Sequence, residues 1–373
     1  MSQPLRILQV VDTLDAGGME AQLVALMNRI EPEKFVFHVI CLRHAGVHAG
    51  RLRENIKVTA LNKAEGFQWD VVRRLGGILA QGWDLVHTHN WAPLVYGVLA
   101  TRGGKIAPIL HGEHAQLTHA EKRPLKIAAR RLLYRCCAAV HTVSVGQRDE
   151  LRACRLAHPQ LLALINGVDT QRFHPADRRK ARECLGMPRD AVIAGLVARY
   201  GSFKRHAALV EAFEQLADQH PQLHLVFVGD GGPEKESVQR QVAASPYSSR
   251  ILLAGHQSNP VPWYQSMNFL VVPSINEGLS NATLEAMACG VPVLSNDICG
   301  SRELLGEDEA GRVCDLGEVG KLAAELAAFL GMTFEAREGL GKAGRARAES
   351  LFSWQGMATA YSQAFMNCAR GRP

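Results

Sequence analysis

Two glutamates in the C-terminal half are spaced so that they could hold a sugar. Glu277 and Glu285 are separated by seven residues, Gly278 loosens the backbone after the first, and a helix is expected over Thr283–Cys289. A carboxylate can accept hydrogen bonds from two vicinal hydroxyls of a ribose or a hexose. Acidic residues often only complement a helix dipole, but this explains Glu285 poorly because it would lie inside the helix. The pair therefore indicates sugar binding.

Two cations upstream of the glutamates could neutralise a diphosphate. Arg199 closes an expected strand, and Lys204 follows five residues later. Two fixed cations suit a diphosphate, although most Arg and Lys side chains lie on solvated surface. Carboxylates alone are poor partners for a phosphate. Together, the cations and carboxylates favour a sugar nucleotide as the ligand.

Glycines and histidines mark strand ends in the N-terminal half. Gly17 and Gly18 follow the first expected strand, where backbone amides could meet a phosphate, although a plain tight turn explains them equally well. Histidines follow two later strands, in the runs His87-Thr88-His89 and His111-Gly112-Glu113-His114. The α/β folds place their sites at the carboxyl ends of strands. We expect a functional role for His111, although histidines often only form hydrogen bonds with loops. No later set of His and Asp residues is present to complete a metal site.

Other ligand signatures are misplaced or incomplete. Gly339, Gly341 and Gly344 match G-x-G-x-x-G but follow no strand, and Gly341-Lys342 is followed by Ala343, not by Ser or Thr as in a P-loop. The net charge of +6 favours anionic partners without choosing among them. The nine cysteines are scattered, with no Cys-x-x-Cys pair, and are typical of reduced thiols in a cytosolic protein.

No secretion signal or membrane span is expected. The chain passes from Met1-Ser2-Gln3-Pro4 straight into the strand-like Leu5–Val11, which leaves no room for a signal peptide. No uncharged apolar stretch reaches the roughly 18 residues that cross a bilayer. We expect a cytoplasmic protein, with any membrane contact peripheral and at the inner face of the plasma membrane. Residues 122–135 mix cations and apolar residues at helical spacing, as interfacial helices do, although an ordinary surface helix does likewise.

Short apolar runs alternate with helical segments along all 373 residues. This length favours two domains, and a content of 47% hydrophobic and 21% charged residues is that of a globular protein. The expected N-terminal strands are Leu5–Val11, Phe35–Leu42, Asp84–His87, Ala107–His111, Ala139–Ser144 and Leu161–Ile165, with a helix over Met19–Ile30. The expected C-terminal strands are Val192–Ala198, Leu223–Gly229, Ile251–Ala254, Asn268–Pro273 and Val291–Ser295, with helices that include Ala207–His220 and Thr283–Cys289.

The pattern predicts an α/β protein with two Rossmann-like parallel-sheet domains that face each other across a cleft, and a helical C-terminal tail. The polar segment Asn166–Asp190 carries Pro175 and Pro188 and is the expected hinge. The chain turns helical after Asp315. The expected divisions are 1–170, a linker at 171–190, 191–352, and a C-terminal helix at 353–373 that packs back toward the N-terminal domain.

Taken in their order along the chain, these motifs resemble those of glycosyltransferase family 4, the retaining enzymes of the GT-B fold. The resemblance extends over nearly the whole chain. The departures are Arg205, where Gly or Asn is common, and Cys299–Glu303, which keeps only part of a glycine-rich stretch. Both departures leave open which sugar nucleotide is the donor. The run at His111 is similar to that of a bacterial subgroup that builds cell-surface polysaccharides. The matching positions are Gly17-Gly18, His111, Asn166-Gly167-Val168-Asp169, Arg199 with Lys204, Gly229-Asp230-Gly231, Glu277 to Glu285 and Gly290-Val291-Pro292-Val293.

The resemblance implies a donor domain at 191–352 and an acceptor domain at 1–170. Its implied catalytic residues are His111, Arg199, Lys204 and Glu277, with Glu277 at the transferred sugar and the two cations at the diphosphate. Glu285 would hold the ribose. The other implied donor-binding residues are Gly17, Gly18, Gly229, Gly278, Leu279, Ser280 and Asn281.

The resemblance also implies transfer with retention by same-face attack, in which the leaving diphosphate helps to deprotonate the acceptor and no protein nucleophile is needed. No Asp-x-Asp is present, so neither an obligatory metal nor a cofactor is expected. The expected partners are a UDP-sugar, with a GDP-sugar next, and a glycan or lipid-linked acceptor of polysaccharide biosynthesis, with no nucleic acid. Two alternatives are a nucleotide-sugar epimerase of the same fold and a non-catalytic nucleotide-sugar-binding protein.

Overall fold

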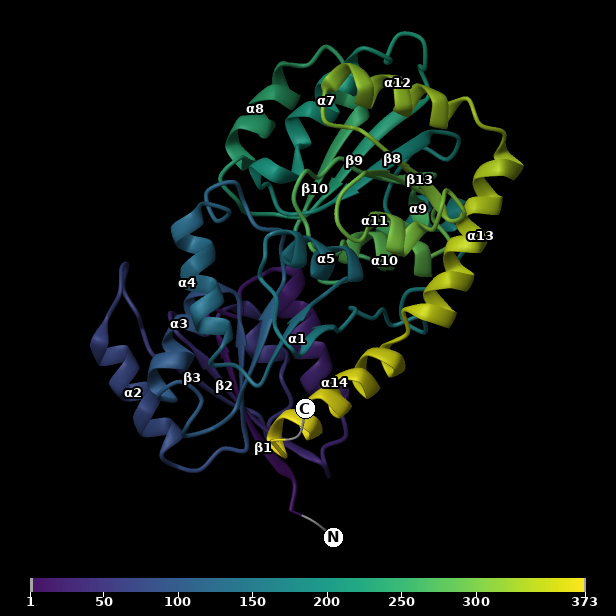
Figure 1. Ribbon diagram of the computed structural model, residues 1–373. Coiled ribbons are helices and arrows are strands. Elements are labelled where there is room, and N and C mark those ends of the chain that lie inside the picture. Colours follow the sequence, from purple (N-terminus) through teal and green to yellow (C-terminus); the bar gives the residue numbers. More distant parts are fainter. Residues whose placement is uncertain (1–2, 372–373) are drawn as a thin grey trace. The chain divides into compact units, whose positions relative to one another are not determined.

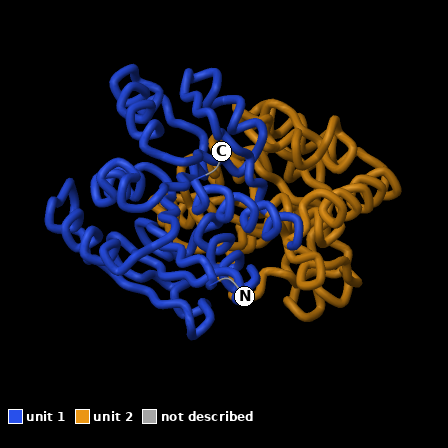
Figure 2. Tube along the Cα trace, turned by 60° about the horizontal axis from the view of Figure 1, so that its bottom comes forward, with its two compact units in different colours: residues 1–166, 355–373 blue, residues 167–354 orange. Residues whose placement is uncertain are grey.

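A computed structural model describes residues 3–371. The chain divides into two compact units (Figure 2): unit 1 combines residues 1–166 with 355–373, and unit 2 comprises residues 167–354. The two residues at each end of the chain, which belong to the expected segments 1–170 and 353–373, lie outside the described residues.

Within the described residues, unit 1 contains a seven-stranded parallel sheet in the order β3-β2-β1-β4-β5-β6-β7. Its central strands are almost continuously apolar and buried, as parallel strands covered by helices on both faces must be. The strands are β1 Leu5–Val11, β2 Phe35–Cys41, β3 Lys57–Ala60, β4 Leu85–His89, β5 Ile109–Glu113, β6 Ala139–Thr142 and β7 Leu161–Ala163. The helices are α1 Gly18–Arg29, η1 Val47–Arg51, α2 Trp69–Leu79, α3 Trp91–Ala100, α4 Pro124–Tyr134 and α5 Val145–Ala153.

The last helix of the chain, α14 (Trp354–Ala369), packs on the unit 1 sheet. The ring of Phe365 meets the rings of Phe35 and Phe37 of β2 edge-on, at centroid distances of 5.7 and 6.1 Å. Helices α2, α3 and α4 cover the opposite face (Figure 1). Helix α14 therefore belongs to the hydrophobic core of unit 1.

Within the described residues, unit 2 contains a six-stranded parallel sheet in the order β10-β9-β8-β11-β12-β13. Helices α7 and α12 pack together, as α10 and α13 do, so that helices cover both faces (Figure 1). The strands are β8 Val192–Val197, β9 Leu223–Val228, β10 Ile251–Gly255, β11 Phe269–Val272, β12 Val293–Asn296 and β13 Gly311–Cys314. The helices are α6 Arg178–Cys184, η2 Ser202–Lys204, α7 His206–Glu214, α8 Lys235–Ala244, η3 Ser248–Arg250, α9 Val261–Ser266, α10 Asn281–Ala288, α11 Ser301–Leu305, α12 Val319–Leu330 and α13 Phe334–Leu351.

Both sheets are doubly wound, so each has a point where the strand order reverses. In unit 1 this point lies between β1 and β4, and in unit 2 between β8 and β11. The loops that leave the carboxyl ends of two such strands diverge to opposite faces of the sheet and open a crevice, in which α/β proteins bind their ligands. These two edges are therefore where ligand-binding residues are to be sought.

The predicted fold class is confirmed, with differences in detail. Strands β4 and β5 each end two residues later than expected, at His89 and Glu113, so that His89 and His111 lie within strands. The short strands β3 and β13 were not predicted; each contains a charged residue, Lys57 or Arg312, and neither has the continuous apolar run of an equally short strand such as β11.

The segment 171–190, which was expected as a turn-rich hinge, contains α6. The buried guanidinium of Arg182 on this helix donates through Nε to the carbonyl of Ser266 at 2.9 Å, so the segment is bonded to unit 2. The glycines of the G-x-G-x-x-G match lie in α13, and a Cβ on Gly341 would come within 2.2 Å of the carbonyl oxygen of Gly290. Gly341 therefore allows α13 to pack closely against Gly290, and all three glycines lie in a helix, as the sequence had indicated.

Among residues 3–371, no helix has both the length and the hydropathy that are needed to cross a membrane.

Candidate active site

The reversal point of the unit 2 sheet brings a cation and a carboxylate into contact. Lys204 ends η2, which follows β8, and Glu277 lies in the loop between β11 and α10. Nζ of Lys204 is 2.8 Å from Oε1 of Glu277, and the two side chains are 21% and 10% exposed. Partial burial strengthens the attraction over that of a surface pair. The structure thus joins two of the four predicted catalytic residues.

Backbone bonds hold the two loops that carry this pair. The amide of Ile275 donates to the carbonyl of Phe203 at 2.9 Å, which ties the loop of Glu277 to η2. The side-chain amide of Asn296, at the end of β12, donates to the carbonyl of Ser274 at 2.9 Å. Neither bond uses the side chain of Lys204 or Glu277, so the loops are also held together by other contacts.

The residues after Glu277 form the turn that starts α10. Ser280 caps the helix, its Oγ accepting a hydrogen bond from the amide of Thr283 at 3.3 Å. Gly278 and Leu279 are buried beneath Gly300, where a Cβ would lie 2.9 Å from the carbonyl of Gly278. Asn281 is the first residue of the helix. Helix N-termini offer unsatisfied N–H groups, so any donor contact of this turn would run mainly through its backbone.

Glu285 lies inside α10 and has a partner that sequence reasoning missed. Its Oε2 accepts a hydrogen bond from the hydroxyl of Tyr264 on α9 at 2.7 Å. Burial raises the pKa of Glu285 to about 7, although the Tyr264 hydrogen bond and the charge of Arg172 act in the opposite direction. Tyr264 stands in a short apolar run with no periodicity, so no signal in the sequence distinguished it from core.

Arg199 and Gly229 lie on neighbouring strand ends in unit 2. Arg199 is exposed two residues after β8. Gly229 has a φ of +143°, and a Cβ there would lie 2.1 Å from the carbonyl oxygen of Ala198. A glycine is therefore required where β9 ends against the segment that carries Arg199, whether or not it touches a ligand.

Arg205, the residue after Lys204, is one departure from the family pattern, and its backbone conformation shows why Gly or Asn is common at this position. Arg205 has a φ of +58°, in the left-handed region that favours Gly or Asn. Its guanidinium donates to the carbonyl of Leu316 and so anchors this turn to the loop after β13.

Gly17 and Gly18 begin α1 at the reversal point of unit 1. Gly17 precedes the helix, and a Cβ on it would lie 2.1 Å from Oε2 of Glu20. The missing side chain lets the Glu20 carboxylate fold back over the positive end of the helix. A phosphate there would meet this carboxylate, so the donor contact expected of the two glycines stays a prediction.

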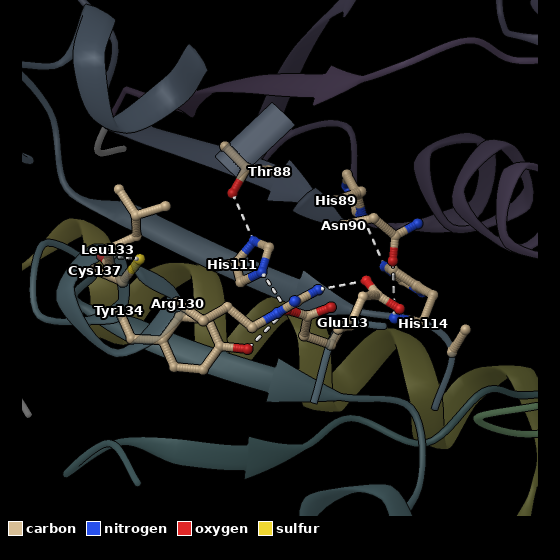
Figure 3. Close-up of polar contacts among 12 residues, drawn as sticks. Thr88, His89, Asn90, His111, Glu113, His114, Arg130, Leu133, Tyr134 and Cys137 are labelled. Atoms are coloured by element: carbon tan, nitrogen blue, oxygen red, sulfur yellow. Dashed lines mark hydrogen bonds and ion pairs between the residues drawn. The ribbon is translucent and has the colours of Figure 1, made fainter. Parts of the chain in front are cut away.

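His111 lies within β5 with no exposed surface (Figure 3). Its Nδ1 is 2.9 Å from the hydroxyl of Thr88, and its Nε2 is 3.3 Å from Oε1 of Glu113. Both ring nitrogens are therefore engaged inside the unit. The catalytic role expected for His111 stays a prediction, and in this conformation the ring presents no group to a ligand.

Glu113 is the centre of a buried polar network on the same face of the sheet (Figure 3). Its Oε1 accepts from Nε of Arg130 at 2.8 Å and from the hydroxyl of Tyr134 at 2.7 Å. Burial would raise the pKa of Glu113, but the hydrogen bond from His111 and the charge of Arg130 outweigh it and hold the pKa well below its usual range. The carboxylate thus stays ionised and fastens α4 to the sheet.

Helix α4, in the predicted membrane-contacting segment 122–135, has two different faces. Arg130 faces inward, where it also bonds Glu121 through Nη2 at 3.1 Å and lies over the ring of Trp91. The outward face carries Leu125 and Leu132, whose exposed fractions are 86% and 61%. One of the cations counted in the sequence is therefore structural, and the exposed apolar side chains are more prominent than the sequence indicated.

Four further histidines form two hydrogen-bonded pairs near the carboxyl ends of β4, β5 and β6. Nε2 of His87 is 2.9 Å from Nε2 of His141, and Nδ1 of His89 is 2.9 Å from Nε2 of His114. Burial lowers the pKa of all four, to about 4 for His114, so the rings are neutral at physiological pH. A Cβ on Gly112 would lie 2.5 Å from Nε2 of His141 and 2.9 Å from Nε2 of His114, so this glycine makes room for both pairs.

No group of three or more His, Cys, Asp or Glu side chains is arranged to hold a metal ion anywhere between residues 3 and 371.

Two doubly wound parallel sheets and a C-terminal helix that packs on the N-terminal sheet form the architecture expected of the GT-B class of glycosyltransferases. Residues 16–172 match the family described as Glycosyltransferase Family 4, and residues 177–347 match the family described as Glycosyl transferases group 1. The chain belongs to glycosyltransferase family 4.

Curated relatives match along most of the chain. A D-inositol 3-phosphate glycosyltransferase from Streptomyces bingchenggensis is 26% identical over 96% of this chain and 86% of its own length. An enzyme of the same name from Geodermatophilus obscurus is 29% identical over 91% of this chain and 82% of its own.

Solved structures share the fold. HepE of Anabaena in complex with UDP and glucose has a TM-score of 0.82 at 18% identity, and covers 97% of this chain and 99% of its own. Sucrose-phosphate synthase from Thermosynechococcus elongatus has a TM-score of 0.83 at 20% identity, with coverages of 97% and 98%. The predicted GT-B fold is thereby confirmed, and the two family matches confirm the glycosyltransferase class.

Proposed function

We propose that the protein moves a hexosyl group from a nucleoside diphosphate sugar to a glycan or lipid-linked acceptor, with retention of anomeric configuration and without an obligatory metal. UDP is the favoured nucleotide and GDP the next. The observation that carries the proposal is the contact between Lys204 and Glu277 at the reversal point of the unit 2 sheet. A cation for the leaving diphosphate and a carboxylate for the sugar hydroxyls stand side by side there.

The chemistry assigned to these residues is stabilisation of charge. As the bond to the anomeric carbon breaks, negative charge develops on the diphosphate, and Lys204 and Arg199 would neutralise it. A fixed donor aimed at developing charge is worth about 2.7–4 kcal/mol of barrier. The carboxylate of Glu277 would orient the sugar, and Glu285 would accept hydrogen bonds from the ribose. His111 would belong to the acceptor side, as the resemblance implies.

The relatives support the choice of donor. HepE has been crystallised with UDP-glucose, and the curated relatives are named for transfer to an inositol phosphate. The first favours UDP here. The second makes a phosphorylated cyclitol an acceptor to try beside the lipid-linked glycans of polysaccharide biosynthesis that the sequence around His111 favours.

Two measurements test this proposal. A thermal-shift screen of UDP- and GDP-sugars should find a donor that raises the melting temperature, because a ligand of the native state stabilises it. NMR of that donor with candidate acceptors should then show a product with the donor's anomeric configuration. Rapid conversion to an epimeric sugar without acceptor would establish an epimerase instead. Binding of the donor with no product from any acceptor would favour a non-catalytic sensor.

We also propose that the outer face of α4 contacts an anionic membrane, where a lipid-linked acceptor would lie. Leu125 and Leu132 lie seven residues apart on one face of the helix and project into solvent. Lys122, Arg123 and Lys126 are exposed at its start. Apolar side chains beside cations suit the boundary between lipid headgroups and acyl chains.

Vesicle co-sedimentation tests the membrane contact. The protein should sediment with vesicles that contain phosphatidylglycerol and should do so less with pure phosphatidylcholine. The double substitution Leu125→Asp and Leu132→Asp should abolish sedimentation, whereas Leu351→Asp, at a 60% exposed leucine of unit 2, should leave it unchanged. Equal sedimentation with both lipids, or an equal loss in the control variant, would remove α4 as the contact.

A further inference from the structure

Phe203, the residue directly before Lys204, presents its aromatic face to the ammonium of that lysine. Nζ of Lys204 lies over the Phe203 ring, 5.4 Å from its centroid. This is within the roughly 6 Å over which a cation is attracted to an aromatic face. The same nitrogen is 2.8 Å from Oε1 of Glu277. The ammonium therefore has two partners of different chemistry, a carboxylate and a ring.

The exposure of Phe203 would carry no argument by itself. Phe203 is 43% exposed, and single exposed apolar residues are common on protein surfaces. What distinguishes this phenylalanine is the place of its ring against a residue of the proposed donor site. The contact with Lys204 gives the ring something to do there.

The chain around Phe203 determines where the ring lies. Residues Ser202–Lys204 form the short helix η2, in which the amide of Lys204 donates to the carbonyl of Gly201 at 2.9 Å. A Cβ on Gly201 would lie 3.0 Å from a carbon of the Phe203 ring. The ring thus packs against the backbone of Gly201, in space that a side chain at that position would crowd.

The backbone of Phe203 is bonded to the other half of the site. Its carbonyl accepts a hydrogen bond from the amide of Ile275 at 2.9 Å, and Ile275 lies two residues before Glu277. Phe203 therefore contacts both partners of the ion pair, the lysine with its ring and the loop of the glutamate with its carbonyl.

An aromatic ring suits this place because it attracts a cation without cancelling its charge. A second carboxylate beside Lys204 would also hold the ammonium, but its negative charge would repel a diphosphate. The face of a neutral ring carries only a quadrupole, so the net charge of the site is unchanged. An ammonium has three N–H donors, and the contact with Glu277 uses one of them. The ring contact therefore preserves both the charge and the donors that an anion needs.

We propose that Phe203 is a positioning residue of the transferase, whose ring holds the Lys204 ammonium in place for the diphosphate of the donor. This inference rests on the proposed function, which assigns Lys204 to that group. When sugar hydroxyls take up the carboxylate of Glu277, the ammonium gives up its ion-pair partner while the ring contact remains. Phe203 thus acts through Lys204 in the state in which the diphosphate departs.

Three replacements at position 203 test the role of the ring. Phe203→Leu keeps an apolar side chain without an aromatic face and should lower kcat/KM for the donor about three- to tenfold. Phe203→Tyr keeps the face and should retain nearly full activity. A ring-fluorinated phenylalanine keeps the shape but withdraws electron density from the face, so the loss should grow with each added fluorine. Phe334→Leu, at a 57% exposed phenylalanine of the same unit, is the matched control and should change nothing.

A double-mutant cycle tests whether Phe203 acts through Lys204. Lys204→Met removes the ammonium and keeps the apolar stem of the side chain. In that background Phe203→Leu should cost no further kcat/KM, because the contact that it removes is already gone. Calorimetric titration with UDP or GDP, without any acceptor, gives a second measurement. The nucleotide should bind about three- to tenfold more weakly to Phe203→Leu than to the wild type or to Phe203→Tyr.

Wild-type kcat/KM and nucleotide affinity in Phe203→Leu would overturn the inference. A full loss from Phe203→Leu in the Lys204→Met background would do the same, because Phe203 would then act by packing alone. Should Phe203→Leu fail to fold, the fluorinated ring decides the matter, and an activity that does not respond to fluorine would overturn the inference.

Lys204→Met separates this failure from that of the proposed function. If Lys204→Met loses turnover and no replacement at Phe203 has an effect, only the role of Phe203 is lost. If Lys204→Met itself turns over normally, the proposed function loses its cation.

Discussion

The carboxyl edges of the two sheets are built from the same kinds of side chain but treat charge in opposite ways. In unit 2, Lys204 and Glu277 meet while both keep some contact with water. In unit 1, Arg130 and Glu113 meet at the same distance of 2.8 Å, but each side chain is only 3% exposed. Lys204 and Glu277 are accessible enough to bind a ligand in place of each other, whereas Arg130 and Glu113 are not.

The difference shows how charge serves two purposes in one fold. A buried ion pair holds its place only if further hydrogen bonds satisfy both groups, and Glu113 has them from Tyr134 and His111. A ligand-binding pair must instead remain accessible, with its attraction strong enough to fix the side chains and weak enough to yield. We therefore expect substitutions in unit 1 to affect stability and substitutions in unit 2 to affect turnover.

The largest effect is expected for Arg130→Met. This change leaves the Glu113 carboxylate buried without its cation, which should lower the free energy of unfolding by about 3–5 kcal/mol. Chemical denaturation monitored by circular dichroism would measure it. The double variant Arg130→Met with Glu113→Gln should recover part of the loss, because no uncompensated charge remains. A loss below 1 kcal/mol in the single variant would mean that the pair does not hold α4.

The next largest effect is expected in unit 2, on the rate. Glu277→Ala and Lys204→Ala should each lower kcat/KM by roughly two to three orders of magnitude, with the melting temperature nearly unchanged, because their role is polar and local. Lys321→Ala breaks a more exposed pair with Asp315 in the same unit and serves as control. Near-normal turnover of Glu277→Ala would remove that residue from the site. A large drop in the melting temperature of either variant would mean that this pair, like Arg130 and Glu113, mainly stabilises the fold.

Much of the fold and part of the site could be read from the sequence. Long apolar runs such as Leu5–Val11 and Leu223–Val228 are strands because only burial on both faces explains them. The spacing from Glu277 to Glu285 and the place of Lys204 after a strand led to a predicted site in unit 2, and the structure brings Lys204 and Glu277 of that prediction into contact. Periodicity and strand ends are local properties, and a sequence states them directly.

What the sequence could not supply were the pairings between distant residues. Tyr264 and Glu285 are 21 residues apart, and His87 and His141 are 54 apart. Arg130 looked like one of several surface cations of a helix, and nothing local distinguished it from Lys126. Burial of a charge depends on which side chain lies opposite on another element, so these contacts became visible only in the structure.

The smallest expected effect is a dependence of donor use on pH, which originates in Glu285 of unit 2. Glu285 is the one carboxylate of the proposed donor site that burial shifts upward, with a pKa of about 7, while Tyr264, Arg172 and Cys289 lie around it. Only its ionised form accepts two hydrogen bonds from a ribose. The kcat/KM for the donor should therefore fall as the pH drops through about 7.

The stability of the donor-free protein should change in the opposite direction. Because the folded-state pKa of Glu285 lies above its unperturbed 4.5, folding favours the protonated form, and the stabilisation present below pH 4.5 is lost as the pH rises through about 7. Tyr264→Phe removes a hydrogen bond to the ionised carboxylate, which should raise the pKa further and move the midpoint of the kcat/KM profile to higher pH. Glu285→Gln should flatten that limb of the profile. A midpoint that stays fixed in Tyr264→Phe would assign the pH dependence to another group and leave Tyr264 as a packing residue only.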